Sequence, residues 1–378
     1  MNILEETVKK VNKLLILFTK ILVVTMVFTL FSCSSGSGQQ EEENVIPDKD
    51  TAVTPDECQD DVADCQSTDD VTPSQEEPDE EQDEKLDEEQ EEKPDEPEEE
   101  SCSDSINSLV IGTYNTHLFF DKICDSGNCS GSDFESVPSD SEYNTKVREL
   151  AESVKEINAD IILLQEVEKV TCLKDLFEKS GNYDEYYLGE KGYSASVDTG
   201  VMTKGKITYK NHHTEQIECS DCEGGKTTFT RAFLETHIEL GCRKIIVFSA
   251  HFRSKNDDDP SRRLAEAAAA AKILRKRAEE HPDALIVMGG DLNDEPGSDT
   301  LKPFENESAF LRVADELSSK DQATYYYRGD AVALDHIFWV KTDGGKYKTG
   351  SVEVVKDAPS YYSLGSSDHA ALKATFEF

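Results

Sequence analysis

The sequence has little positive charge. Its 378 residues hold 39 Lys and Arg against 79 Asp and Glu, a formal net charge of −40. Residues 41–100 carry most of this imbalance, with 29 acids and three lysines, while residues 101–378 hold 48 acids and 32 bases, a net of −16. This acidity excludes a basic coat for nucleic acid over the whole surface, so any phosphate substrate must be held by a local site.

Residues 41–100 also lack aromatic side chains and have few branched apolar ones. Such a segment cannot bury enough apolar surface to offset the entropy of ordering it, and its charges repel one another. We therefore predict a disordered acidic tether over residues 34–104, extended by its prolines and its charge. The remaining residues, 105–378, are enough for one large α/β domain with its own core.

Residues 1–33 have the pattern of an export signal. Lysines precede an apolar run at residues 14–31, and small and polar residues follow it, which is typical of a secretory signal. Cys33, directly after the run, resembles the lipidated cysteine of a bacterial lipobox, although Phe31 stands where a smaller residue is usual. The alternative is an uncleaved signal anchor, because the run is nearly long enough to span a bilayer. Both interpretations place the rest of the chain outside the cytoplasm, in the cell envelope and held at the inner or outer membrane.

The ten cysteines are expected to form disulfides in an exported protein. Cys172 and Cys242 lie beside predicted strands and could pair, which would leave Cys102 over. A lone CxxC is weak support for zinc, and the sequence alone does not define the connectivity. The cysteines that lie close together in the sequence form three pairs, Cys58 with Cys65, Cys124 with Cys129, and Cys219 with Cys222.

Residues 105–378 alternate between strand and helix patterns, without an internal repeat. Apolar residues at spacings of three and four predict a helix over residues 143–158. Asp259 as a cap, followed by Pro260 at the first helical position, predicts a second helix over residues 260–280. So many strands indicate two packed sheets with helices outside. Apolar and β-branched runs predict strands at residues 108–115, 160–166, 229–240, 244–251, 284–290, 323–328, 332–341, 351–356 and 370–377.

Polar residues that are costly to bury without a partner stand at the ends of these strands. Any one of them could simply face water or form a turn. Several in one domain indicate a site, because ligands of α/β folds gather where strand ends and their loops converge. The polar residues in question are Asn115, Glu166, His251, Asp291, Asn293, Asp335, Asp368 and His369.

These residues fall in motifs that resemble the endonuclease/exonuclease/phosphatase superfamily. The motifs are TYN (113–115), LLQEVE (163–168), SAHFRSK (249–255), GGDLNDEPGS (289–298), LDHIFW (334–339) and SSDH (366–369). Their order and spacing match over residues 105–378, and GDLN followed later by SDH is specific in combination. The resemblance implies a four-layered α/β sandwich, with two packed mixed β-sheets flanked by helices, and catalysis of phosphate ester hydrolysis.

The resemblance also implies a divalent cation with oxygen ligands, Mg²⁺ or Mn²⁺, with Ca²⁺ as a further possibility. By analogy with the family's Gln-Glu motif, Glu166 would be the primary ligand. Asn115 and Asp368 would complete the metal site directly or through water. The cation would neutralise a phosphate oxygen and stabilise the leaving oxygen. The number of metal ions stays open.

The same resemblance implies the catalytic roles. Asp291 and Asn293 would position or deprotonate the attacking water and hold the phosphate. His369 would contact the scissile phosphate, with Asp335 fixing its orientation, because a carboxylate behind a histidine aligns the ring and stabilises its cation. His251 would donate a hydrogen bond to the phosphate or assist the leaving group. Which group is the base and which the acid stays open.

Four further features have a functional and a structural interpretation. Arg253 and Lys255 follow His251 and could reach phosphates, but ordinary surface charge is the alternative. Arg328 could clamp a phosphate or a base. The neighbouring tyrosines at 325–327 are interpreted as sheet core, unless an exposed ring stacks on a base. We expect His336 to be structural, since it should point to the face opposite Asp335.

The leading functional hypothesis is an exported, membrane-tethered, metal-dependent phosphoesterase, most simply a nuclease acting on DNA or RNA. The HFRSK run resembles the HLKSK run of secreted bacterial nucleases in the superfamily. One alternative is a phospholipid or inositol-phosphate phosphodiesterase such as a sphingomyelinase, although the polar segment 217–226 offers no apolar hairpin for a membrane. A second is a non-catalytic binding lipoprotein on the same scaffold. No protein partner is evident, and a monomer is expected.

Overall fold

The computed structural model describes residues 105–256, 258–358 and 361–378. The predicted signal peptide, its Cys33 and the acidic tether lie outside the described residues. Within the described part of the chain, no helix is long and apolar enough to cross a membrane.

The first large sheet contains the strands at both ends of the domain. Its hydrogen-bonded order is β15-β17-β1-β2-β4-β3, and β16 also pairs with β17. The β1 and β2 strands run parallel, whereas β17 and β4 flank them antiparallel, so the sheet is mixed. The bounds are Ser108–Phe119 for β1, Ile161–Val167 for β2, Glu185–Gly189 for β3, Asp198–Thr203 for β4, Lys346–Tyr347 for β15, Glu353–Val355 for β16 and Ala371–Glu377 for β17.

The second large sheet has the order β11-β14-β10-β9-β8-β5 and is also mixed, because only β9 and β10 run parallel. Two small hairpins, β6–β7 and β12–β13, lie apart from both sheets. The bounds are Lys206–His213 for β5, Gln216–Glu218 for β6, Lys226–Thr228 for β7, Phe233–Leu240 for β8, Arg243–His251 for β9, Leu285–Asp291 for β10, Phe310–Arg312 for β11, Tyr325–Tyr327 for β12, Asp330–Val332 for β13 and Asp335–Val340 for β14.

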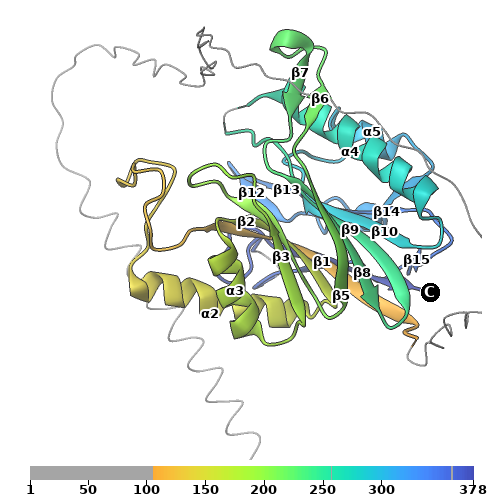
Figure 1. The fold of residues 1–378 in the computed structure, drawn as a ribbon, viewed down its shortest axis with the longest axis horizontal. Coiled ribbons are helices and arrows are strands. Elements are labelled where there is room, and N and C mark those ends of the chain that lie inside the picture. The colour runs from red at the N-terminus through yellow and green to blue at the C-terminus, as the bar shows by residue number, and fades with distance from the viewer. Residues whose placement is uncertain (1–104, 257, 359–360) are drawn as a thin grey trace, which may run out of the picture. The chain divides into compact units, whose positions relative to one another are not determined.

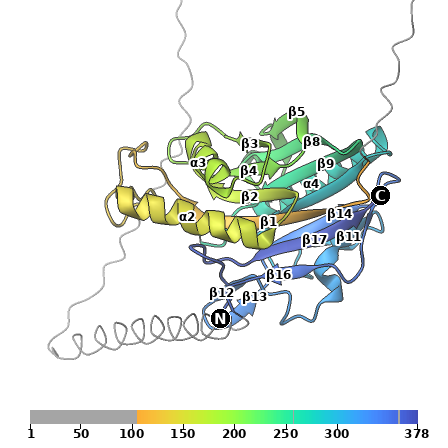
Figure 2. The ribbon, with the colours of Figure 1, turned by 90° about the horizontal axis from the view of Figure 1, so that it is seen from below.

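The two sheets pack face to face with helices on the outside (Figures 1 and 2). Side chains such as Ile111, Leu163 and Val287 form the buried layer between the sheets. The helices α2 (Asp140–Ile157) and α3 (Val170–Ser180) cover the first sheet, and α4 (Pro260–Glu280) and the short α5 (Lys302–Glu305) cover the second. Two 3₁₀ turns, Glu223–Gly225 and Val313–Glu316, complete the elements. The predicted four-layered sandwich of two packed mixed sheets is confirmed.

Local capping explains where the two long helices begin. Ser139 and Glu142 form a reciprocal capping box at the start of α2, three residues before the predicted start. Asp259 accepts a hydrogen bond from the Arg262 backbone N–H, and Pro260 occupies the first position of α4, as predicted. Both helices therefore start where orphan backbone donors find a side-chain acceptor.

Three features of the fold differ from the sequence-based expectations. The strands β3, β4 and β5 were not predicted. The β3 and β5 strands are short or partly exposed, and the buried β4 strand begins with Asp198, Thr199 and Gly200 instead of an apolar run. The predicted strand 332–341 is divided, since β13 ends at Val332 and β14 begins at Asp335. The tyrosines of β12 are not sheet core: Tyr326 is 56% exposed and Tyr327 is 43% exposed.

The disulfides agree with two of the expected pairs. Cys124 joins Cys129, and Cys219 joins Cys222, so the CxxC forms a disulfide. The suggested pairing of Cys172 with Cys242 is wrong. Cys172 is a free thiol on the buried face of α3, whereas Cys242 is disulfide-bonded and lies in the turn between β8 and β9 of the other sheet.

Candidate active site

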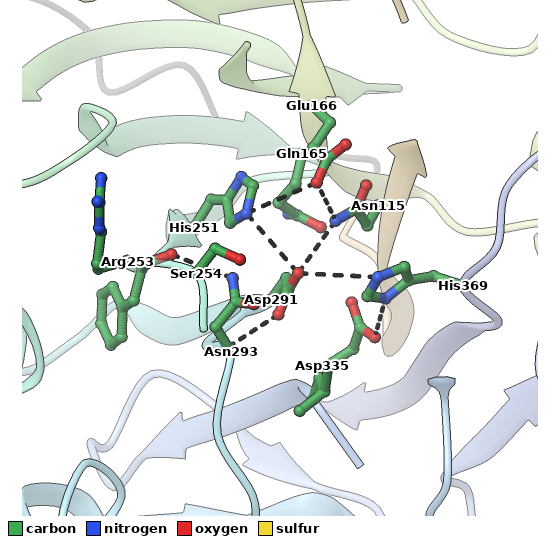
Figure 3. Close-up of polar contacts among 12 residues, drawn as sticks. Asn115, Gln165, Glu166, His251, Arg253, Ser254, Asp291, Asn293, Asp335 and His369 are labelled. Carbon is green, nitrogen blue, oxygen red and sulfur yellow. Dashed lines mark hydrogen bonds and ion pairs between the residues drawn. The ribbon is translucent and has the colours of Figure 1, made fainter. Parts of the chain in front are cut away.

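The polar residues of the motifs meet where strands of both sheets end. In the first sheet Asn115 pairs in register with Gln165, one residue before Glu166. In the second sheet Asp291 is the register partner of both His251 on β9 and Asp335 on β14. Figure 3 shows these side chains pointing toward one another across the gap between the sheets. The sandwich thus converts positions far apart in the sequence into one cluster.

Two carboxylates and a histidine form the centre of this cluster. The candidate ligand atoms of Glu166, Asp291 and His251 lie within 4.8 Å of one another. The His251 Nε2 atom is 3.8 Å from Glu166 Oε1 and 3.7 Å from Asp291 Oδ2. Burial, followed by the charges of Arg231 and His369, holds the pKa of His251 well below its usual range. A neutral imidazole beside two carboxylates is a donor set that a divalent cation can use.

The side chain of Asn115 joins the two carboxylates. Its Nδ2 donates to Glu166 Oε1 at 3.1 Å and to Asp291 Oδ2 at 3.0 Å. Its Oδ1 accepts from the His117 backbone N–H at 2.9 Å, which fixes this orientation of the amide. Asn115 therefore lies at the predicted metal site as a hydrogen-bond donor to the carboxylates, and its oxygen faces away from them.

The carboxylate pair has the electrostatic character of a cation site. Burial, helped by Asp335 and Glu166 and opposed by His369, raises the pKa of Asp291 to about 7. Two acids held this close repel each other in their charged forms, and a bound cation removes that repulsion. Glu166 also accepts from the Leu118 backbone N–H at 2.7 Å. The residues present therefore fit a hard divalent cation.

Asp368 forms an ion pair with a histidine of the first sheet. Its Oδ1 makes an ion pair of 2.8 Å with His117 Nδ1. Burial raises the pKa of Asp368, but His117 and His369 outweigh it and lower the value overall. The structure thus pairs Asp368 with His117, a residue for which the sequence suggests no role.

His369 and Asp335 form a buried pair on the other side of Asp291. The His369 Nδ1 atom is 2.8 Å from Asp335 Oδ2, and its Nε2 is 3.9 Å from Asp291 Oδ2. Burial lowers the pKa of His369, but Asp335, followed by Asp291 and Asp368, raises it to about 10. The ring is therefore a cation at neutral pH, with its Nε2 directed at the carboxylate centre.

Backbone strain is concentrated at this site. Glu166, Asn293, His117 and Leu118 all have φ values between +48° and +63°, a left-handed conformation that costs free energy outside glycine. The Asn293 backbone N–H donates to Asp291 Oδ1 at 2.8 Å, and its Nδ2 donates to the Phe252 carbonyl at 3.1 Å. The strained residues are held by these hydrogen bonds in the positions that the cluster requires.

The three predicted phosphate-binding residues lie in different surroundings. Lys255 pairs with Asp294 Oδ1 at 2.7 Å. Arg253 donates its backbone N–H to Glu266 Oε2 at 2.7 Å, and Figure 3 shows it beside the site. Arg328 lies over the Tyr327 ring, 5.0 Å from its centroid. His336 is buried, with Nε2 2.9 Å from the Asp294 carbonyl, in agreement with the expected structural role.

Sequence reasoning missed two cations near the centre. Arg231 was assigned to a strand but lies in the segment before β8, where Glu166, Glu266 and Asp291 act on its charge. Lys146 of α2 donates to the carbonyls of His117 at 2.6 Å and Ser366 at 3.1 Å, and burial lowers its pKa to about 8. No motif marks either residue, because their positions depend on contacts between distant segments.

This fold and this cluster define a class of hydrolases that act on phosphate esters. The chain belongs to the endonuclease/exonuclease/phosphatase family, whose model matches residues 112–369. Enzymes of this family are generally dependent on divalent metals, in agreement with the carboxylate centre.

One relative of the chain is a phosphodiesterase by name. The chain is 23% identical over 242 residues to a 5'-tyrosyl-DNA phosphodiesterase of Caenorhabditis elegans, and the alignment covers 61% of this chain and 62% of the relative. The chain thus spans less than two thirds of that protein's length.

Solved structures show the same fold. A Bacteroides vulgatus endonuclease/exonuclease/phosphatase has a TM-score of 0.51 at 17% identity, and the match covers 72% of this chain and all of that one. A Bacteroides thetaiotaomicron mannosyl-6-phosphatase has a TM-score of 0.51 at 16% identity, over 71% of this chain and all of the other. Truncated TDP2 of C. elegans has a TM-score of 0.50 at 18% identity, over 72% of this chain and 98% of that one.

Proposed function

We propose that this protein is an exported, lipid-anchored phosphodiesterase that hydrolyses DNA or RNA with the help of a divalent cation, Mg²⁺ or Mn²⁺. The observation that carries this proposal is the arrangement of His369 and Asp335 opposite the carboxylates of Glu166 and Asp291. This arrangement places the positively charged His369 ring where it can bind a phosphate oxygen, and the carboxylates of Glu166 and Asp291 where they can attract a metal ion.

The catalytic roles follow from the charges of the residues. His369, protonated at neutral pH, would donate from Nε2 to an oxygen of the scissile phosphate, while Asp335 holds the ring through Nδ1. Asp291, with a pKa of about 7, would orient the attacking water and accept its proton. Asn293 keeps Asp291 in place through its backbone N–H.

Glu166 and the Nε2 atom of His251 would hold the cation, beside the carboxylate of Asp291. When bound, it supplies charge neutralisation at the phosphate and at the leaving oxygen. Asn115 keeps the two carboxylates at a fixed separation through its amide N–H groups. Arg231 and Arg253 would bind further phosphate oxygens from the side of His251.

Two features support a nucleic acid as the substrate. The HFRSK run at residues 251–255 resembles a run in secreted nucleases, and the similar C. elegans protein is a 5'-tyrosyl-DNA phosphodiesterase by name. The proposal of export and lipid anchoring depends on the pattern of residues 1–33, with Cys33 as the modified residue.

The test is a substrate panel on the full-length protein in detergent. Plasmid DNA, single-stranded DNA, RNA, sphingomyelin and a chromogenic phosphodiester would each be offered with Mg²⁺ or with EDTA. We expect turnover of a nucleic acid that EDTA abolishes. Turnover of lipid without turnover of nucleic acid would overturn the substrate, and absence of metal-dependent turnover on every substrate would overturn the enzyme.

For the anchor, mass spectrometry of the purified protein should find a diacylglycerol adduct on Cys33 as the new N-terminus. An intact residue 1–33 segment would contradict lipidation.

A further inference from the structure

A groove lined by tyrosines opens next to the candidate active site. It has a volume of about 700 Å³, and four of its lining residues are Tyr325, Tyr326, Tyr361 and Tyr362. Asp368, the sequence neighbour of His369, forms part of the same wall. The groove therefore borders the catalytic cluster.

The tyrosine rings come from two separate segments. Tyr325 and Tyr326 belong to β12, and Tyr361 and Tyr362 belong to the loop before the SSDH motif. The rings of Tyr326 and Tyr362 are parallel within 6°, with centroids 5.8 Å apart. The Tyr325 ring lies against the His369 imidazole, with centroids 4.6 Å apart and an angle of 31°. One ring thus contacts a catalytic side chain, and the others extend away from it.

Two of these tyrosine rings are largely exposed to solvent. Tyr326 is 56% exposed and Tyr361 is 53% exposed. Exposed large apolar surface beside a concave polar site is a common sign of ligand contact. The stacked pair Tyr326–Tyr362 presents two parallel ring faces.

The charge of the domain restricts what such a groove can bind. Residues 101–378 carry a net charge of −16, so attraction to the phosphates of a nucleic acid is weak over the domain as a whole. Stacking on an aromatic ring does not depend on net charge, and every base offers a π-face. Bases paired inside a duplex already stack on each other, so only unpaired bases can use the tyrosines.

We propose that this tyrosine groove binds the unpaired nucleobases of a single DNA strand next to the phosphate at His369. The proposal rests on the proposed nuclease function and makes it specific to unpaired strands or ends. Tyr325, whose ring lies against His369, forms the end of the groove next to the scissile phosphate. A base stacked in the groove is connected through its own phosphate to the site beside Asp368 and His369. The predicted substrate is single-stranded DNA, with affinity from stacking more than from charge.

The test compares two oligonucleotides of equal length, with the full-length protein in detergent and Mg²⁺. One carries bases on every sugar, and the other has tetrahydrofuran abasic sugars with the same phosphates. We expect the base-bearing strand to be cleaved with a kcat/KM at least about tenfold higher, mainly through KM. Replacing Tyr326 and Tyr362 together with Ala should remove this preference, so that the two strands are cleaved with similar kcat/KM.

Two control variants make the comparison sharp. The double change Tyr326→Phe and Tyr362→Phe keeps the rings, so it should keep the preference. Tyr209→Ala removes an exposed tyrosine of β5 that does not line the groove, so it should have no effect.

The outcomes separate the groove from the nuclease function. If both strands are cleaved equally, or the alanine variant slows both equally, the groove does not bind bases although the nuclease function stands. If a blunt duplex is cleaved as fast as the single strand with the same loss in the variant, the restriction to unpaired bases is wrong. If neither strand is cleaved while the chromogenic phosphodiester is, the nuclease function itself fails.

Discussion

Asp335 sets the charge of the residue that would contact the phosphate. Its Oδ2 is 2.8 Å from His369 Nδ1 and is the main influence that raises the pKa of that ring against the effect of burial. Without the carboxylate, burial would favour the neutral ring. The pair therefore explains how a buried histidine can serve as a cation.

Replacing Asp335 with Asn should move the alkaline limb of the pH–rate profile to lower pH. The ring is protonated below its pKa, which is about 10 in the intact pair, so lowering that pKa makes the active form disappear at lower pH. The measurement is kcat/KM for a chromogenic phosphodiester between about pH 5 and 10. His369→Ala should reduce kcat by about 10²–10⁴-fold, whereas His281→Ala, at the end of α4, should leave it unchanged. An unshifted limb in the Asp335 variant would contradict this role.

Glu168 is a buried carboxylate that the catalytic cluster does not use. It is 3% exposed, its Oε2 accepts from the Asp121 backbone N–H at 2.6 Å, and its Oε1 has no hydrogen-bond partner within the described part of the chain. Burial, followed by the Asp121 and Glu135 charges, raises its pKa to about 7.

Glu168→Gln should therefore stabilise the protein at high pH and not at low pH. A folded-state pKa above the ordinary 4.5 means that the favourable protonated form is fully present below 4.5 and is lost as the pH rises to about 7. The variant escapes this loss, so its free energy of unfolding should exceed that of the wild type by about 1–2 kcal/mol at pH 8. Urea melts at pH 4.5 and pH 8 would measure the difference, with the exposed Glu152→Gln as the control.

At the scale of elements, one buried carboxylate ties together two strands and a helix. Glu235 on β8 contacts His213 of β5 at 2.7 Å, His237 of its own strand at 2.6 Å and Arg277 of α4 at 2.5 Å. Burial raises its pKa, but these three groups outweigh burial and lower the value well below the ordinary one. The contacts fix α4 on the second sheet.

Glu235→Ala should destabilise the fold by about 3–5 kcal/mol, because it removes the buried carboxylate that pairs with Arg277 and with the two histidines. The depressed pKa gives stability above pH 4.5 that is lost as the pH falls, so Glu235→Gln should show a flatter decline below that pH. Thermal unfolding between about pH 3 and 7 would measure both effects. The exposed Glu239→Gln on the same strand is the matched control, and equal melting curves for the two positions would refute the role of the network.

At the scale of the whole molecule, the active-site cluster joins the two sheets. Glu166 comes from one sheet and Asp291 from the other, and their negative charges face each other across the interface. Gln165 also spans the sheets through its Nε2, which donates to Ser249 Oγ at 3.1 Å. A cation between the carboxylates should therefore stabilise the packing of the sheets as well as the reaction.

Mg²⁺ should raise the melting temperature, because binding to the folded state alone stabilises it by mass action. Asp291→Asn or Glu166→Gln should reduce this shift strongly, whereas Glu156→Gln, exposed on α2, should keep it. Differential scanning fluorimetry with Mg²⁺ or EDTA is the measurement, and it needs no substrate. A shift that survives both site variants would place the cation elsewhere.

Part of the fold could be predicted because local patterns determine it. The capping residue Asp259 with Pro260 located α4, and the continuous apolar run before Asp291 located β10. The exposed strand β5 has no such pattern, since its alternation is interrupted by polar and charged residues, and so it was missed. Short partly exposed strands are defined mainly by their neighbours in the sheet.

The sequence by itself determined which residue types stand at the strand ends, and hence the family and the class of reaction. Only the tertiary structure decided that the Asn115 amide nitrogen faces the carboxylates, that Asp368 pairs with His117, and that Arg231 lies near the site. The reason is that motifs record chemistry along the chain. Distances across two packed sheets depend on register, side-chain orientation and burial, which are defined only once the sheets have packed.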